Sequence, residues 1–207
     1  AQEADLLRFG LGEVEEVYAL TRTYEPTRYL KWPEREGPVR SDVEDTSMAI
    51  LKFKNGVVGE WTWTTAAPGE RLGHHVVHGT LGSIGREEGL VTTAGKKQQK
   101  ATPLQSLSEE MVNSLSEEER SRLFPGGIGL GPKEQAASWA VELWDFADAL
   151  IHSRKPEVDG VMGLRAEAVP MAIYESSRLG KPVEVARVER CEVENYQREI
   201  NEALGIS

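Results

Sequence analysis

The chain has 207 residues, of which 39% are hydrophobic and 28% charged, and its formal net charge is -10. That composition is typical of a globular protein with a sizeable core, and the negative charge argues against binding nucleic acid or anionic membranes through bulk charge. No apolar run approaches the ~20 residues that a membrane span needs, and the single Cys191 cannot form an internal disulfide. We therefore expect a cytoplasmic protein with no nucleic-acid or membrane partner.

The chain opens on what is predicted to be the end of a helix, at residues 3–9. Leu6, Leu7 and Phe9 would form its apolar side, and the glycines that follow, up to Gly12, are typical of a helix stop. Nothing in the chain could form the first turns of this helix. We therefore expect this chain to be the back part of a longer protein.

The strongest local pattern is SMAILKFKNGVVGEWTWTT, in which two extended runs flank Asn55-Gly56. This dipeptide is a strong signal for a β-hairpin. A two-residue loop would pair Ile50 with Trp61 and Met48 with Trp63, so that these four residues share a buried face of an antiparallel sheet. The opposite face would carry the polar residues of the second strand: Glu60, Thr62 and Thr64.

Other extended runs group early in the chain, and helical patterns group late. Further strands are expected at 14–24, 74–80, 82–95 and 181–188. Helices are expected at 107–124 (one or two short ones), 134–153, 160–180 and 193–204. Because strands precede helices without βαβ alternation, we expect the α+β class. The sheet should be large and mostly antiparallel, with the helices around 139–153 and 163–179 on one face.

The best helical pattern lies at 134–153. Four large apolar residues recur there at 4-3-4 spacing, which predicts one apolar face: Trp139, Leu143, Phe146 and Leu150. Within 107–124, Ser108 or Ser116 is expected to be the N-cap of a helix.

Two long segments, 25–45 and 124–133, are predicted to be loops, which at this length are usually functional or disordered. The second contains Gly127-x-Gly129-x-Gly131. This is not the G-x-G-x-x-G spacing of a dinucleotide-binding turn, and no strand precedes it. We interpret it as a flexible connection and GTLGSIG at 79–85 as a turn, so no cofactor-binding residue is predicted in this chain.

Three of the four histidines, His74, His75 and His78, lie within five residues of each other. Their spacing matches no standard zinc pattern and no cysteine or carboxylate pair accompanies them, so no metal site is predicted. Two interpretations stay open: a polar strand end that lines a pocket, and ordinary sheet residues. The sequence also has no nucleophile elbow and no paired carboxylates, so the residues alone predict no catalytic set.

The order of four segments along the chain indicates a protein family more specifically than any one segment does. DLLRFGLGEVEEVYAL is followed by EDTSMAILKFKNGVVGEWTWT, HHVVHGTLGSI and ELWDFADALIHSRKPEVDGVMGLRAEAVPMAIYESSRLGKPVEV. In this order they resemble the C-terminal half of the glucose–fructose oxidoreductase / inositol dehydrogenase / rhizopine-catabolism (Gfo/Idh/MocA) family. The resemblance implies a single C-terminal domain over residues 1–207 that supplies part of a substrate pocket and oligomer contacts. It also implies an N-terminal Rossmann domain, absent from this chain, that binds NAD or NADP.

The resemblance further implies where substrate would lie. Family members bring an Asp-x-x-x-His segment, with another Asp three residues after the His, to the reacting carbon on the first helix of this domain. Asp5 matches the last Asp, whereas Gln2 stands at the position of the His, and an amide cannot accept a proton at neutral pH. Either the lysine of the family's Glu-Lys-Pro motif, expected in the preceding half, works alone, or the region of His75 contributes, or the parent protein has lost the usual dehydrogenase chemistry.

Four residues are therefore expected to bind substrate: Gln2, Lys31, His74 and His75. The segments that carry them, namely 74–78, the loop 28–40 and the start of the chain, should converge at one edge of the sheet.

The leading prediction is the substrate-binding and oligomerisation domain of an NAD(P)-dependent oxidoreductase that acts on a sugar, polyol or cyclitol. The parent should form a homodimer or larger assembly, and the isolated chain should have no activity. The expected contact surface is the less apolar face of the hairpin, with Val58 and Leu51 beside Thr62 and Thr64. The alternative is a non-catalytic homodimeric binding or assembly module.

Overall fold

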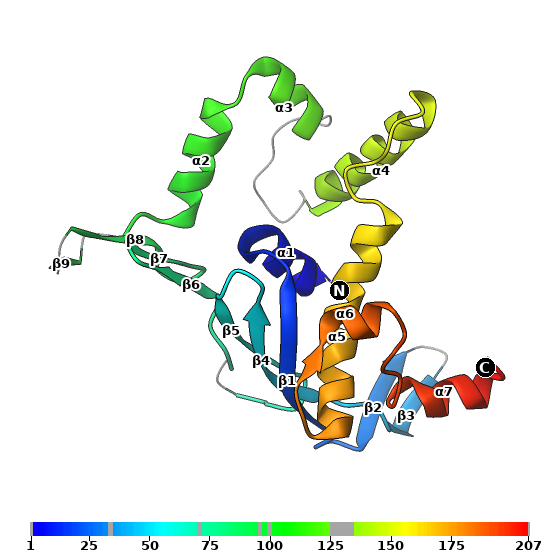
Figure 1. The fold of residues 1–207 in the computed structure, drawn as a ribbon. Coiled ribbons are helices and arrows are strands. Elements are labelled where there is room, and N and C mark those ends of the chain that lie inside the picture. Colours follow the sequence, from blue (N-terminus) through cyan, green and yellow to red (C-terminus); the bar gives the residue numbers. More distant parts are fainter. Residues whose placement is uncertain are drawn as a thin grey trace. The chain divides into compact units, whose positions relative to one another are not determined.

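The computed structural model describes residues 2–32, 35–69, 72–94, 97–98, 101–124 and 135–206. The chain divides into two compact units, the first comprising residues 1–73 and 160–207 and the second residues 74–159. Every strand pairing in the described part of the chain is antiparallel, and helices accompany the sheets, so the predicted α+β class is confirmed. The described strands form sheets of four, two and four strands (Figure 1).

The first unit contains α1 (Gln2–Leu11), β1 (Val14–Arg22), β2 (Thr27–Trp32), β3 (Arg35–Arg40), β4 (Thr46–Phe53), β5 (Val58–Thr64), α5 (Gly160–Leu179), β10 (Val183–Glu184), α6 (Val185–Glu189) and α7 (Gln197–Leu204). The second contains β6 (Val76–Gly79), β7 (Gly82–Gly85), β8 (Gly89–Ala94), β9 (Lys97–Gln98), α2 (Leu104–Ser114), α3 (Glu117–Leu123) and α4 (Gln135–Ile151). No helix of the described residues is long and apolar enough to cross a membrane.

The sheet of the first unit has the order β10-β1-β4-β5, and α5 packs along β1. Apolar side chains from β1, β4 and α5 fill the space between sheet and helix. The largest of them are fully buried: Val17, Leu51, Phe53 and Val169. The core of this unit therefore lies on the face of the sheet that α5 covers.

The β4–β5 hairpin forms as predicted, but its register differs by one residue. Gly56 N donates to Phe53 O at 3.0 Å and Phe53 N donates to Val57 O at 2.9 Å, which makes a three-residue loop. Gly56 has φ +87°, the left-handed conformation of a G1 bulge, which glycine adopts without strain. Ala49 therefore lies opposite Trp61, where a two-residue loop would have placed Ile50.

This shift changes which β4 residues share a face with Trp61: they are Ala49 and Leu51 instead of Met48 and Ile50. The predicted burial of Met48, Ile50 and Trp63 is wrong, since these residues are 50%, 50% and 45% exposed. Leu51, which was expected on the less apolar open face, is buried under α5.

The edge of β1 that faces away from β4 is closed by two kinds of partner. Strand β10 pairs with β1 at Glu16 and Val17. Beyond the part of β1 that pairs with β10, serines of α5 accept its backbone hydrogen bonds. Ala19 N donates to Ser176 Oγ and Thr21 N donates to Ser177 Oγ, both at 2.9 Å. The sequence ESSRLG thus supplies hydroxyl acceptors where no strand continues the ladder.

Four predicted elements of the first unit differ in the structure. Helix α1 buries Ala4 and Arg8, whereas Leu6 and Phe9, expected on its apolar side, are 65% and 91% exposed. The segment 25–45, predicted to be a loop, forms the two-stranded β2–β3 ribbon. The strand predicted at 181–188 is limited to β10, because α6 begins at Val185. The last helix begins at Gln197 rather than at 193.

The second unit contains a four-stranded sheet of order β6-β7-β8-β9. The turn predicted over GTLGSIG is limited to Thr80 and Leu81, because Gly79 ends β6 and Gly82–Gly85 forms β7. Gly82 is required there, since it has φ +154° and an added Cβ would lie 2.1 Å from Val91 O. The segment 124–133, expected as a flexible connection, lies outside the described residues apart from Phe124.

The helices of the second unit also match their predictions in part. Ser116 caps α3 in a capping box with Glu119, whereas Ser108 lies inside α2. Helix α4 forms, but its four predicted face residues are between 56% and 70% exposed: Trp139, Leu143, Phe146 and Leu150.

Candidate functional site

Helix α1 carries the residues that the sequence placed nearest to substrate. Gln2 is the first residue of the helix, and its side chain is exposed. The side chain of Asp5 is 44% exposed. Because residues three apart lie on the same side of a helix, α1 presents an amide and a carboxylate together at its N-terminal end.

Arg8 anchors this helix to the rest of the first unit. Its guanidinium donates to Glu13 from Nε at 3.0 Å and from Nη2 at 2.8 Å. From Nη1 it donates to the carbonyl of Met162 at 3.1 Å and to Asp5 at 3.4 Å. The hydrogen bond between Arg8 and Glu13 raises the pKa of Arg8 and lowers the pKa of Glu13. The buried Arg8 therefore joins α1 to the start of β1 and to α5, and it holds the Asp5 carboxylate from one side.

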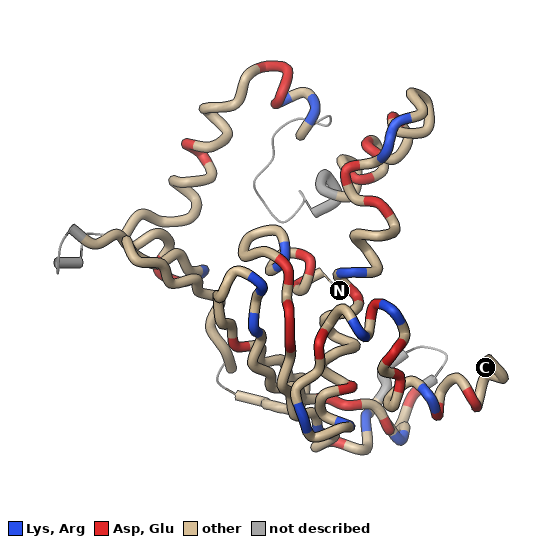
Figure 2. The backbone as a smooth tube through the Cα atoms, in the orientation of Figure 1, with Lys and Arg blue, Asp and Glu red and all other residues tan. Residues whose placement is uncertain are grey.

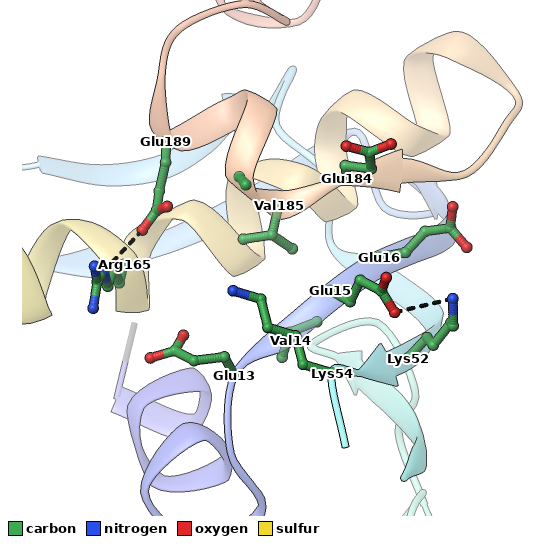
Figure 3. A pocket seen from close by; sticks show the side chains of 11 residues that line it. Glu13, Val14, Glu15, Glu16, Lys52, Lys54, Arg165, Glu184, Val185 and Glu189 are labelled. Atoms are coloured by element: carbon green, nitrogen blue, oxygen red, sulfur yellow. Dashed lines mark ion pairs between the residues drawn. The ribbon is translucent and has the colours of Figure 1, made fainter. Parts of the chain in front are cut away.

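A groove of about 560 Å³ lies at the end of the sheet near this anchor (Figure 3). It is lined by residues from β1 and its approach, from the end of β4, and from α5, β10 and α6: Glu13, Val14, Glu15, Glu16, Lys52, Lys54, Arg165, Glu184, Val185, Ala186 and Glu189. Figure 2 shows the acidic residues gathered along the first part of β1.

Charges in the groove largely compensate one another. Lys52 Nζ lies 3.0 Å from Glu15 Oε2, and Arg165 Nε lies 3.3 Å from Glu189 Oε1. The hydrogen bond with Glu15 raises the pKa of Lys52. Exposed pairs of this kind add little stability. Gln2 is not among the described residues that line the groove, so the groove is distinct from the predicted substrate-binding end of α1.

The other predicted substrate residues lie in separate places. Lys31 is in β2, opposite Glu36 of β3. His74 and His75 belong to the second unit, immediately before β6, and both are exposed. Their convergence with Gln2 stays a prediction.

The described residues offer little for a metal or a nucleotide. None of their His, Cys, Asp and Glu side chains form a group of three or more that could hold a metal ion. Their glycine-rich stretch at 79–85 joins two antiparallel strands, whereas a dinucleotide needs a strand-to-helix turn to hold its pyrophosphate. The described glycine-rich stretch is therefore not a dinucleotide-binding turn.

The geometry defines an α+β domain with open antiparallel sheets, one of them covered on one face by a helix. Residues 3–85 match the family model of the GFO/IDH/MocA C-terminal domain. The resemblance of the sequence to this family is thus confirmed over residues 3–85.

Several solved structures share this fold. Levoglucosan dehydrogenase in complex with NADH and levoglucosan is 25% identical, with 87% of this chain and 47% of that chain covered and a TM-score of 0.56. The WlbA dehydrogenase from Bordetella pertussis in complex with NADH and UDP-GlcNAcA is 23% identical, with coverages of 88% and 45% and a TM-score of 0.52. An oxidoreductase from Agrobacterium radiobacter in complex with NAD+, L-tartaric acid and magnesium is 20% identical, with coverages of 88% and 46% and a TM-score of 0.53.

The chain spans about half the length of these three proteins. No curated protein matches it.

Sequence reasoning missed the charged residues that position these elements. Arg8 lies four residues after Ala4 and three before Leu11, and therefore on the side of α1 that packs against the core. A cation among these packed positions is the sequence signal that could have identified Arg8 as an anchor. Asp45 is 3% exposed at the start of β4, and its sequence context, EDTS, gives no sign of burial.

Proposed function

We propose that this chain is the substrate-binding and oligomerisation half of an NAD-dependent oxidoreductase that acts on a sugar, polyol or cyclitol. The family match carries the proposal, because it identifies the C-terminal domain of a family of oxidoreductases. NAD is the proposed cofactor because the similar structures named above were solved with NADH or NAD+. It would bind to a preceding Rossmann domain in the cytoplasmic parent protein, where it accepts or donates a hydride.

The proposed role of this chain is to hold the substrate hydroxyl groups. Gln2 can donate and accept hydrogen bonds from the exposed start of α1, which Arg8 holds in place. His74 and His75 are exposed and can do the same, and Lys31 supplies three N–H donors. Since Gln2 cannot act as a base, we assign it to binding and not to proton transfer.

The open face of the first unit's sheet supports the proposed oligomerisation. Tyr18 lies opposite Ile50, and Leu20 lies opposite Met48, so the four side chains form one apolar strip across β1 and β4. Their exposed fractions are 45%, 50%, 51% and 50% respectively. A contiguous apolar strip of this kind on a sheet face favours packing against a second copy of the chain.

Activity of the full-length protein tests the enzymatic proposal. We expect the full-length protein to form NADH from NAD+ with at least one of levoglucosan, L-sorbose, L-tartrate and UDP-GlcNAcA or a related polyol, and the isolated chain to form none. Gln2→Ala should raise KM more than it lowers kcat, whereas the exposed Gln105→Ala in α2 should change neither. A full-length protein that oxidises no member of a broad polyol panel would support the alternative, a non-catalytic homodimeric assembly module.

Light scattering tests the oligomeric proposal separately. We expect a homodimer or larger assembly for the unmodified chain and a monomer for Ile50→Lys. Leu6→Lys places the same charge on an exposed apolar position of α1 and should leave the assembly intact. A monomer before any substitution contradicts the proposal.

A further inference from the structure

Asp45 is a buried carboxylate with an unusually complete set of hydrogen-bond donors. It is 3% exposed, and it lies between the segment 41–44 and strand β4. Its Oδ2 accepts from Glu25 N at 2.7 Å and from Tyr24 N at 2.9 Å, and its Oδ1 accepts from Thr46 Oγ1 at 3.1 Å. A buried charge is tolerated when its lone pairs are satisfied in this way.

The donors place this carboxylate at the base of the β2–β3 ribbon. Tyr24 and Glu25 precede β2, and Ser41 N, which follows β3, donates to Pro26 O at 2.8 Å. The backbone of Asp45 is fixed as well, since its N–H donates to Arg22 O at 3.0 Å and its carbonyl oxygen accepts from Thr65 N at 2.9 Å. Asp45 thus connects the ribbon to the ends of β1 and β5.

Arg28 extends this connection into the ribbon itself. Its Nη2 lies 3.4 Å from Asp45 Oδ2 and donates to Thr65 Oγ1 at 2.9 Å, while Nη1 donates to Glu25 Oε2 at 2.8 Å. The rest of the ribbon is a two-stranded sheet, which is marginally stable in water when nothing supports it. Its orientation therefore depends on the bonds at its base.

We propose that Asp45 is a positioning residue that fixes the orientation of the β2–β3 ribbon, and through it the substrate contact of Lys31. The second half of this statement rests on the proposed function, in which Lys31 holds a substrate hydroxyl. Asp45 touches no substrate itself. It acts by holding the β2–β3 hairpin in one orientation relative to the four-stranded sheet of the first unit.

Hydrogen–deuterium exchange of the chain tests the fixation. Asp45→Asn keeps the size of the side chain but removes its charge and one of its two acceptor oxygens. Amides of 24–32 and 35–41 should then exchange at least about tenfold faster, with β1 and β4 unchanged. Arg28→Gln should accelerate the same amides. Asp42→Asn, which neutralises an exposed carboxylate of the neighbouring loop, should leave them unchanged.

Two exchange results would overturn the proposal. Unchanged ribbon exchange in Asp45→Asn would show that Asp45 does not hold the ribbon. Equal acceleration in β1 and β4 would show that Asp45 merely stabilises the unit as a whole.

Kinetics of the full-length protein test the link to Lys31. Asp45→Asn and Lys31→Ala should raise KM by similar factors with kcat retained, and the double variant should raise KM no further. Independent, multiplying effects would refute the link. If the unmodified protein oxidises no compound of the panel, the proposed function fails, and the exchange experiment alone decides whether Asp45 fixes the ribbon.

Discussion

Replacing Ser176 by alanine removes the hydroxyl that closes the free edge of β1. Ser176 is 0% exposed; its Oγ accepts from Ala19 N at 2.9 Å and donates to Lys181 O at 2.8 Å. Lys181 is exposed, so water can satisfy its carbonyl after the change. Ala19 is 1% exposed, and its N–H would be left buried without an acceptor. An orphaned buried donor, together with the lost bond, lowers the free energy of unfolding by about 2–3 kcal/mol.

Urea and thermal unfolding of the first unit measure this loss. Trp61 packs against the core of this unit, so its fluorescence reports the transition. We expect a lower urea midpoint with an unchanged m-value and a melting temperature reduced by about 5–10 °C. Thr23→Ala removes an exposed hydroxyl of the same unit and should change the free energy by less than about 0.5 kcal/mol. A Ser176→Ala effect as small as that of the control would refute the assignment of Ser176 as the acceptor that closes the edge.

Three further predictions concern the same unit. Phe53→Ala should lower the free energy of unfolding, measured in urea, by about 3–5 kcal/mol, because Phe53 is 1% exposed. A loss below about 1 kcal/mol, close to the effect of a substitution at an exposed site, would contradict its central place in the core. Burial acts to raise the pKa of Asp45, but the N–H groups of Glu25 and Tyr24, the Thr46 hydroxyl and Arg28 outweigh it and hold that pKa below its ordinary value. The stabilisation by Asp45 is therefore complete above about pH 4 and is lost as the pH falls through the lowered pKa. The protection factors of the ribbon amides should accordingly fall in acid in the unmodified chain and show no such step in Asp45→Asn. Burial and the hydrogen bond to Glu44 raise the pKa of Tyr196, so Tyr196→Phe should remove the last tyrosine to ionise in an alkaline absorbance titration.

The hairpin illustrates how far sequence reasoning reaches. Asn55-Gly56 identified the turn, because a glycine with positive φ is needed in both two-residue and three-residue loops. The choice between the loops decides the register, and the alternation of apolar residues supports both: Met48 and Ile50 in one register, Ala49 and Leu51 in the other. Contact with α5, more than a hundred residues away in the chain, selects the second register.

The ribbon shows a second limit. The segment 25–45 contains three prolines and mixed charges, which usually indicate a loop. In the structure Pro38 lies within β3, a strand with β2 on one side, where its missing N–H need not break a ladder bond. What orders this segment is Asp45, whose burial depends on donors that follow from the fold and not from any local pattern.

Three buried charges share one role in the first unit: each fixes a segment by directional bonds, beside the apolar contacts that α1 and the chain before α7 also make through Ala4 and Val193. Arg8 fixes α1, Asp45 fixes the ribbon, and Glu175, 1% exposed in α5, accepts from Asn195 N and Tyr196 N at 2.9 Å and so fixes the chain before α7. Apolar packing is non-directional and tolerates substitution as long as volume is kept, whereas a buried charge that loses its partner is strongly destabilising. The orientation of α1 and of the ribbon, which carry Gln2 and Lys31, is therefore set by directional bonds. Substitutions at these anchors should alter ligand binding at positions they do not touch, while substitutions among the core valines and alanines should alter stability alone.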